Sequence, residues 1–221
     1  MFKNIRYDIR AIKERDPAAR SSFEVLMLYS GFHAVLYHRV AHWFFKHKMK
    51  FIARWISQAA RAVTGVEIHP GATIGKGLMI DHGMGVVIGE TAVVGDNCTI
   101  YQGVTLGGTG KDTGKRHPTI GNNVMIGSGA KVLGPFTVGD NAKIAAGAVV
   151  LDAVPEGATA VGVPARMIYP GASKKEMPCK SDLDQIHIPD PVSQELCKLM
   201  MRIENLEKAL SEKEEKSSNN Q

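Results

Sequence analysis

Two short polar segments of this 221-residue chain carry side chains suited to chemistry, namely Asp81-His82 and Arg116-His117. A histidine titrates near neutral pH, so it can take a proton from one group and return it to another. An arginine presents a planar fork of donors that matches a carboxylate. We therefore expect the chemistry of the chain at these two segments.

Both segments interrupt a regular six-residue pattern. An aliphatic residue recurs at every sixth position and is usually followed by glycine and then by polar or small residues. This period fits neither an α-helix nor a simple alternating strand. It is typical of hexapeptide repeats and predicts a left-handed parallel β-helix of triangular coils, with the aliphatic side chains stacked inside. The pattern is kept by Ile68, Ile74, Ile80, Ile88, Val94, Ile100, Leu106, Ile120, Ile126, Val132, Val138, Ile144 and Val150.

The glycine after the aliphatic residue suits a corner of the coil, where positive φ or close backbone approach would strain a residue with a Cβ. Extra residues fit a solenoid only in loops that leave the coil. Residues 81–85 add two residues to the pattern, and residues 107–119 form a long polar excursion. The glycines in question are Gly75, Gly89, Gly95, Gly107, Gly121, Gly127 and Gly139.

Shifts in composition divide the chain into three regions and predict an α+β protein. Residues 1–65 are rich in helix formers and are expected to form an N-terminal α-helical domain. Asp16-Pro17 is typical of an N-cap with proline at the first helical position, and Thr64-Gly65 closes the helical part. Residues 66–168 are expected to form the β-helix domain.

Residues 169–221 are expected to form a linker, a C-terminal amphipathic helix and a disordered end. The helix is either a short coiled coil or an amphipathic helix lying on its own domain, since its heptad pattern lasts barely two heptads. The heptad positions are Leu196, Leu199, Ile203, Leu206 and Leu210.

The composition argues against several classes of protein. Cys98, Cys179 and Cys197 are odd in number and widely spaced, which favours reduced thiols in the cytoplasm over a disulfide framework. The net charge of +5 is mild and scattered, so no nucleic acid partner is expected. The N-terminus lacks a hydrophobic signal core and no stretch approaches a membrane span, so no membrane association is expected.

The pair Asp81-His82, the Gly-Gly-Thr-Gly loop at 107–110 and the segment Arg116-His117-Pro118 resemble motifs of bacterial serine O-acetyltransferases, and the resemblance runs from Arg15 to Arg166. Hexapeptides alone would indicate only the wider acyltransferase superfamily, whereas the Asp-His pair and the Gly-Gly-Thr-Gly loop with its Arg-His-Pro are more specific. The matching motifs are Arg-Asp-Pro-Ala (15–18), Gly-Phe-His-Ala (31–34), Ile-His-Pro-Gly-Ala (68–72), Asp-His-Gly-Met-Gly (81–85), Gly-Glu-Thr-Ala (89–92), Gln-Gly-Val-Thr-Leu-Gly-Gly-Thr-Gly-Lys (102–111), Arg-His-Pro (116–118) and Gly-Val-Pro-Ala-Arg (162–166).

The resemblance implies transfer of acetyl from acetyl-CoA to the hydroxyl of L-serine, the first step of cysteine biosynthesis from serine. It implies that His82 is the general base and acid, and that Glu67 orients the imidazole. Many relatives carry aspartate at the position of Glu67, so the carboxylate of this chain is one methylene longer.

The resemblance also assigns binding residues. It implies that serine is bound by Asp16, Asp81, Arg116 and His117. It implies that acetyl-CoA is bound by Gly108, Ser128, Lys143, Ala146 and Arg166. No metal is expected.

Assembly is a further expectation from the resemblance. In this family the active site generally lies between subunits, so a homotrimer is expected, with a dimer of trimers as the alternative. Many family members end in an isoleucine that inserts into O-acetylserine sulfhydrylase. This chain ends in Gln221, so that complex is not expected.

Three other functions are alternatives. A β-helical zinc carbonic anhydrase would use His69, His82 and His117 as zinc ligands at a trimer interface. A hexapeptide acetyltransferase for another hydroxylated acceptor would share the fold and the coenzyme. A catalytically silent trimeric scaffold would have no need of His82 or Glu67.

Overall fold

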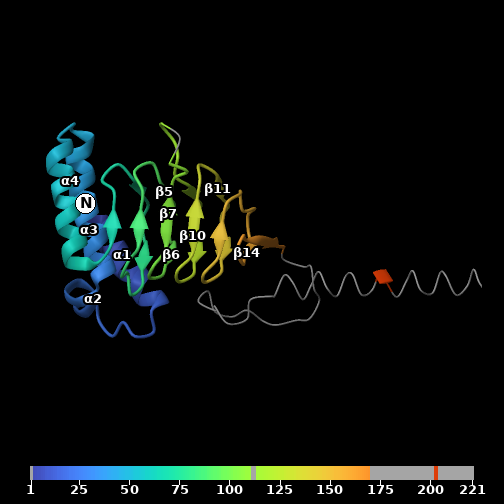
Figure 1. The fold of residues 1–221 in the computed structure, drawn as a ribbon. Helices are drawn as coiled ribbons and strands as arrows, with labels where there is room; N and C mark the ends of the chain where they lie inside the picture. Colours follow the sequence, from blue (N-terminus) through green and yellow to red (C-terminus); the bar gives the residue numbers. More distant parts are fainter. Residues whose placement is uncertain (1, 111–112, 170–201, 204–221) are drawn as a thin grey trace, which may run out of the picture. The chain divides into compact units, whose positions relative to one another are not determined.

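The computed structural model describes residues 2–110, 113–169 and 202–203. Four helices precede the coil, and they lie together at one end of the stacked strands (Figure 1). Gly65 ends the last helix with φ 73°, and its amide donates to the carbonyl of Arg61, so the helical part closes at Thr64-Gly65 as predicted. The helices are α1 (Phe2–Arg15), α2 (Ser22–Leu28), α3 (Ser30–Lys46) and α4 (Lys50–Thr64).

The predicted N-cap at Asp16-Pro17 is wrong. Asp16 follows the last residue of α1, and its amide still donates to the carbonyl of Ile12 at 2.8 Å. Its Oδ1 accepts from the amide of Ala18 at 2.8 Å, which closes a tight turn. Helix α2 begins later, after Ser21, whose hydroxyl accepts from the amide of Glu24. An aspartate in a turn and an aspartate at an N-cap bond the same kind of nearby amide, so the sequence pattern did not separate them.

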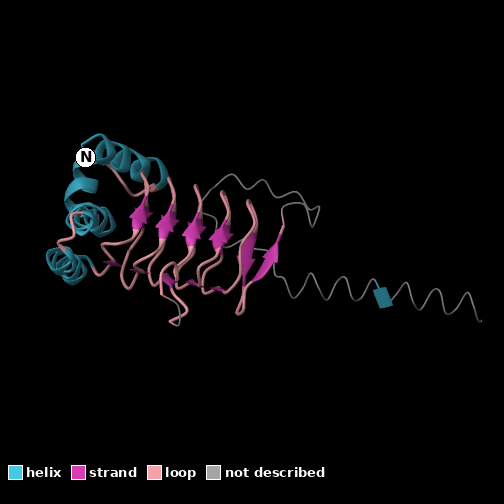
Figure 2. Ribbon diagram, turned by 90° about the horizontal axis from the view of Figure 1, so that it is seen from above, coloured by secondary structure: helices cyan, strands magenta, loops and turns pink. Residues whose placement is uncertain are grey.

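The strands form three parallel sheets that make the three faces of the coil, and Figure 2 shows their repeated stacking along the coil. Face A holds β1 (Glu67–Ile68), β4 (Val87–Ile88), β7 (Thr105–Gly107), β10 (Lys131–Leu133) and β13 (Val149–Val150). Face B holds β2 (Thr73–Ile74), β5 (Val93–Val94), β8 (Thr119–Ile120) and β11 (Thr137–Val138). Face C holds β3 (Met79–Ile80), β6 (Thr99–Ile100), β9 (Met125–Ile126), β12 (Lys143–Ile144), β14 (Thr159–Val161) and the antiparallel β15 (Arg166–Ile168).

The six-residue pattern predicted the core of the coil. Each predicted inward residue pairs with its equivalent one coil later, so the side chains stack in three columns. All are buried except Ile74, which is partly buried. The columns are Ile68, Ile88, Leu106, Val132 and Val150 on face A, Ile74, Val94, Ile120 and Val138 on face B, and Ile80, Ile100, Ile126 and Ile144 on face C. The fold is the predicted left-handed parallel β-helix.

Close approach, and not positive φ, explains the glycines of the repeat. A Cβ on Gly127 would lie 2.5 Å from the amide nitrogen of Ala146, and one on Gly95 would lie 2.5 Å from the carbonyl oxygen of Gly121. Neither glycine has positive φ, which occurs instead at other turn positions such as Asn123. Of the two reasons given for these glycines, the contact between successive coils is the one that applies.

The chain divides into two units, Met1–Ile188 and Pro189–Gln221. In the second unit only Arg202 and Ile203 are described, and both are helical. The predicted linker, the disordered end and the other heptad leucines lie outside the described residues. None of the described helices has the length and apolar character needed to cross a membrane.

Candidate active site

The predicted site residues lie at two different corners of the coil. The CA corner comprises the turns that lead from face C to face A, and it contains Asp81 and His82 between β3 and β4. The AB corner comprises the turns that lead from face A to face B, and it contains Arg116 and His117 between β7 and β8. The β7–β8 segment projects from the body of the coil (Figure 1).

At the CA corner the extra residues of the first interruption present His82 to solvent. His82 has φ 57°, in the left-handed region that few non-glycine residues adopt, and its side chain is 74% exposed. The Nε2 atom of His82 lies 3.9 Å from Oδ1 of Asp81. Unusual backbone of this kind gathers at functional sites, because the surrounding structure must hold it there.

Asp16 directly follows α1 and is held by the helices. Arg15 anchors the end of α1 to the coil, and its guanidinium donates to the Asn97 and Cys98 carbonyls and to the Thr99 hydroxyl at 2.9–3.0 Å. The Tyr29 hydroxyl then donates to Oδ2 of the neighbouring Asp16 at 2.6 Å.

The residues that follow Tyr29 reach the CA corner itself. A Cβ on Gly31 would overlap the carbonyl oxygen of Ile80, and one on Gly83 would lie 3.7 Å from the Ser30 hydroxyl. These contacts place Tyr29, which holds the Asp16 carboxylate, next to the segment that packs on the corner of Asp81 and His82.

At the AB corner an ion pair orients Arg116. Its Nη2 donates to Oε2 of Glu90 at 2.5 Å, and this bond holds the pKa of Glu90 below its usual value. Gly108 packs against the stem of Arg116, since a Cβ there would lie 3.1 Å from Cγ of that residue. The Lys115 ammonium donates to the carbonyl of Thr91 at 2.7 Å and fixes the base of the loop.

His117 is buried at the same corner, and Thr91 fixes its protonation. The Thr91 amide donates to Nδ1 of His117, and the Thr91 hydroxyl lies 2.9 Å from the same nitrogen. That hydroxyl also accepts from the backbone amides of Arg116 and His117. Burial lowers the pKa of His117, and the charge of Arg116 lowers it further. His117 is therefore a neutral imidazole whose proton is on Nε2.

Glu67 lies on β1 and pairs with two arginines of α4. Arg54 contacts Oε1 at 3.0 Å and Arg61 contacts Oε2 at 3.3 Å, while the Gln58 amide lies 3.5 Å from Oε1. These are the polar partners of Glu67 among the described residues, and His82 is not one of them. Orientation of His82 by Glu67 therefore stays a prediction.

The residues predicted to bind acetyl-CoA also divide between the two corners. Ser128 and Ala146 lie in successive turns of the CA corner, and Lys143 lies on the neighbouring strand β12. Gly108 lies at the AB corner, and Arg166 begins β15 at the far end of face C. One chain therefore brings Ser128, Lys143 and Ala146 together but not Gly108.

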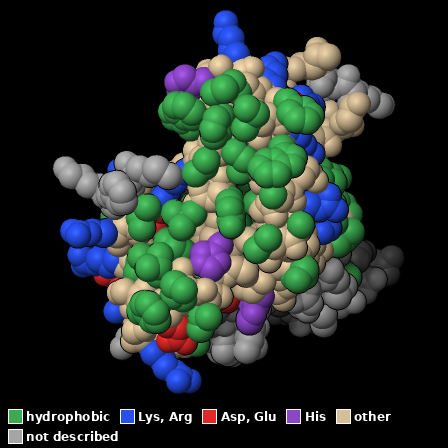
Figure 3. All heavy atoms as spheres, turned by 90° about the vertical axis from the view of Figure 1, so that its left-hand side faces the viewer, with side chains coloured by type: hydrophobic (Ala, Val, Ile, Leu, Met, Phe, Trp, Pro, Cys, Tyr) green, Lys and Arg blue, Asp and Glu red, His purple; other side chains and the backbone are tan. Residues whose placement is uncertain are grey.

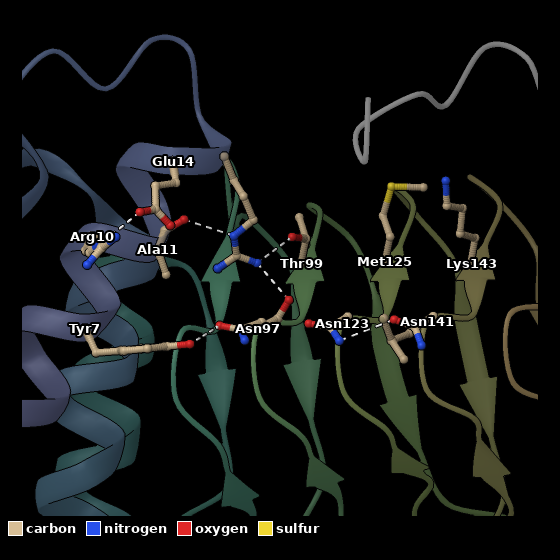
Figure 4. A pocket seen from close by; sticks show the side chains of 12 residues that line it. Tyr7, Arg10, Ala11, Glu14, Asn97, Thr99, Asn123, Met125, Asn141 and Lys143 are labelled. Atoms are coloured by element: carbon tan, nitrogen blue, oxygen red, sulfur yellow. Dashed lines mark hydrogen bonds and ion pairs between the residues drawn. The ribbon is translucent and has the colours of Figure 1, made fainter. Parts of the chain in front are cut away.

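Lys143 also lines a pocket of about 680 Å³ between α1 and face C (Figure 4). Among its lining residues the Tyr7 hydroxyl donates to Oδ1 of Asn97, and the side-chain Nδ2 of Asn123 donates to Oδ1 of Asn141. Its other lining residues are Arg10, Ala11, Glu14, Arg15, Thr99, Val124 and Met125.

The zinc alternative uses His69, His82 and His117 at a trimer interface, where each site would take its ligands from different subunits. Within one chain His69 and His117 share the AB corner, and His82 is at the CA corner. In the part of the chain that the structure describes, no three His, Cys, Asp or Glu side chains are grouped to hold a metal ion.

Four polar residues of the site were not singled out from the sequence. Glu90 and Thr91 belong to the Gly-Glu-Thr-Ala motif, which matches the family but carries no predicted catalytic or binding role. Tyr29 and Arg54 lie on helices, and nothing in the six-residue pattern points to them. Only the packing of the helices on the coil reveals their contacts.

Known families match both parts of the chain. The model for the N-terminal part of serine acetyltransferase matches residues 1–36. The model for the bacterial transferase hexapeptide matches residues 117–152, and that for the hexapeptide repeat of succinyl-transferase matches residues 85–108.

Named relatives agree with these matches. A serine acetyltransferase of Synechococcus elongatus is 54% identical over 210 residues, which cover 95% of this chain and 84% of that protein. The crystal structure of serine acetyltransferase in complex with coenzyme A from Brucella abortus is 48% identical, with a TM-score of 0.74, and the match covers 76% of this chain and 67% of that one. That of the Neisseria gonorrhoeae enzyme in complex with serine is 47% identical, with a TM-score of 0.73, over 76% and 68% of the two chains.

Proposed function

The chain belongs to the serine acetyltransferase family, and we propose that it transfers the acetyl group of acetyl-CoA to the hydroxyl of L-serine. The products are O-acetyl-L-serine and CoA, and the reaction is the first step from serine to cysteine. One observation carries the proposal, which is the exposed imidazole of His82 at a break in the six-residue pattern, 3.9 Å from the carboxylate of Asp81.

The proposed reaction needs one proton carrier. His82 takes the proton of the serine hydroxyl as the oxygen attacks the thioester carbon, and a tetrahedral intermediate forms. The C–S bond then breaks, and the imidazolium returns the proton to the departing thiolate of CoA. A group that titrates near neutrality serves both steps, because it gives up and accepts the proton within the same pH range.

The proposed serine site binds both charged groups of the amino acid, its ammonium group and its carboxylate. Asp16 and Asp81 bind the ammonium group, and Arg116 binds the carboxylate with the Nε2 proton of His117 as a second donor. The bond from Nη2 to Glu90 orients the Arg116 guanidinium, and the other N–H groups of the guanidinium are the ones proposed to bind the serine carboxylate. Glu67 orients the imidazole of His82 in this proposal.

Acetyl-CoA is the proposed acetyl donor. Ser128, Lys143 and Ala146 flank its path along the coil, Gly108 lines the opposite wall, and Arg166 binds a phosphate. Coenzyme A in the complex of the Brucella abortus relative supports this donor.

A homotrimer in the cytoplasm is the proposed assembly. Its support is the division of the site between the CA and AB corners, because a neighbouring subunit can bring its AB corner to His82. A dimer of trimers is the alternative. Hydrophobic side chains gather on the helical end of the molecule (Figure 3), and on α4 Phe51, Trp55 and Val63 are 84%, 67% and 73% exposed. A solution mass equal to three chains supports the trimer, six supports the alternative, and two contradicts both.

A thiol-release assay tests the proposed function. Acetyl-CoA is offered with serine and with a panel of other hydroxylated acceptors, and free CoA is measured for the wild type, His82→Ala and Arg116→Ala. Serine should be the best acceptor. His82→Ala should lower kcat by about 10²–10⁴, the usual range for general acid and base catalysis.

The Arg116 variant tests whether the enzyme recognises the carboxylate of the acceptor. Arg116→Ala should impair serine far more than an alcohol without a carboxylate. The proposed function is wrong if the folded wild type releases no CoA with serine, or if His82→Ala releases it at the wild-type rate.

A further inference from the structure

Tyr29 makes a short hydrogen bond to Asp16, next to the segment that packs on the corner of Asp81 and His82. It is the single residue between α2 and α3, and its backbone is extended, with φ −84° and ψ 104°. Its hydroxyl donates to Oδ2 of Asp16 at 2.6 Å, while the amide of Ala18 donates to Oδ1. Each oxygen of the Asp16 carboxylate thus has one donor, which fixes the plane of the group.

The donors that hold Asp16 are neutral, unlike those of two other acidic residues of the site. Glu67 and Glu90 are held by arginines, so their charges are compensated. A hydroxyl and a backbone amide orient the carboxylate of Asp16 but leave its negative charge in place. A carboxylate that is fixed but not neutralised is suited to binding a cation.

The Tyr29 hydroxyl remains a donor throughout the physiological pH range. Burial raises the pKa of Tyr29, and the hydrogen bond to Asp16 raises it further. The charge of Asp81 acts in the same direction, so Tyr29 lies within electrostatic range of both carboxylates.

We propose that Tyr29 is a positioning residue for the amino-acid acceptor, because its hydroxyl holds the Asp16 carboxylate where the acceptor's ammonium group binds. The inference rests on the proposed function, in which Asp16 and Asp81 bind that ammonium group. Tyr29 touches neither the thioester nor the hydroxyl that reacts. Its effect should therefore fall on the affinity for serine and not on the chemical step.

Steady-state kinetics of Tyr29→Phe test the proposal. The substitution removes one hydroxyl and keeps the ring that packs between the helices. The KM for serine should rise about tenfold, the lower end of what a hydrogen bond to a charged group contributes. The kcat and the KM for acetyl-CoA should change less than twofold, and Tyr37→Phe, which alters an exposed tyrosine of α3, should match the wild type.

A double-mutant cycle separates positioning from a general effect on folding. If Tyr29 acts through Asp16, Tyr29→Phe should raise the serine KM in the wild type but have little further effect in Asp16→Asn. Equal effects in both backgrounds, or an unchanged serine KM in Tyr29→Phe, would overturn the proposal. The outcome is distinct from failure of the proposed function, in which the wild type itself would not acetylate serine.

Discussion

The carboxylates of this site are held either by neutral donors or by arginines, and this difference indicates their roles. Asp16 is oriented by a hydroxyl and an amide, whereas Glu67 and Glu90 are paired with arginines. An arginine partner keeps a carboxylate ionised and fixed but removes its attraction for a cation. The charge of Asp16 therefore stays available to the ammonium group of serine in the proposed site.

Thr91 organises the opposite side of the site through one hydroxyl. Its oxygen accepts from the amides of Arg116 and His117 and contacts Nδ1 of His117. Thr91→Val keeps the shape of the side chain but leaves these groups without their partner. We expect the serine KM to rise at least fivefold and the folded state to lose about 1–3 kcal/mol, because the unpaired groups are partly buried.

Serine kinetics and urea unfolding of Thr91→Val measure both effects. Thr73→Val, at an exposed position on β2, is the matched control and should resemble the wild type. Wild-type serine kinetics in Thr91→Val would show that this hydroxyl does not organise the Arg116 side of the site.

At the scale of elements, the close contact between successive coils explains a glycine that the sequence repeats. A Cβ on Gly127 would lie 2.5 Å from the backbone of Ala146, and backbone cannot move aside as a flexible side chain can. Gly127→Ala should therefore destabilise the fold by about 2–3 kcal/mol, near the upper end of the cost of overpacking. Urea unfolding measures the change.

Gly147→Ala is the control for this prediction. Gly147 has φ 70° with open space where a Cβ would lie, so alanine there has only the backbone cost of about 1 kcal/mol. If Gly127→Ala loses no more stability than Gly147→Ala, close approach does not explain the repeated glycine.

Helix α3 carries a buried histidine that links stability to pH. His38 is 4% exposed, and burial lowers its pKa to about 3, with the nearby charges of His42, Arg39 and His69 acting in the same direction and a hydrogen bond to the Ala72 backbone opposing them. The unfolded chain binds a proton at His38 below about pH 6.5, while the folded chain does not. Stability should therefore fall as pH drops from about 6.5 toward 3, by up to about 1.4 kcal/mol per pH unit from this group.

Urea unfolding between pH 7 and pH 5, at a fixed protein concentration, tests this linkage. The free energy of unfolding of His38→Gln should fall less steeply with decreasing pH than that of the wild type. The difference in slope should approach that of one bound proton at pH 5. His47→Gln, at an exposed histidine of the adjoining turn, should keep the wild-type slope. An unchanged slope in His38→Gln would mean that His38 is not held neutral in the folded state.

The sequence could predict the coil because each inward residue repeats at a fixed interval. Ile88 and Ile100 occupy equivalent places on different faces, so one pattern defines the whole core. It could not predict the contacts of the helices, which depend on how four elements without a common repeat pack on the coil. The pattern at Asp16 therefore predicts an N-cap where the structure has a turn, and nothing in the sequence around Tyr29 indicates its bond to that carboxylate.

At the scale of the whole molecule, the separation of the two corners is the feature that decides how the enzyme works. His82 and Arg116 leave the coil at corners on opposite sides of face A, so the residues proposed to act on one serine do not gather in one chain. Assembly with a neighbouring AB corner would complete each site. A monomer should then be inactive even when it is fully folded.

Complementation between two inactive variants tests this account most directly. His82→Ala and Arg116→Ala chains are unfolded together in equal amounts, refolded as mixed trimers and assayed for serine-dependent release of CoA. If each site takes His82 from one subunit and Arg116 from its neighbour, about a quarter of the sites regain both residues and a similar share of wild-type activity returns. Mixed trimers that are no more active than the separate variants would contradict a site shared between subunits.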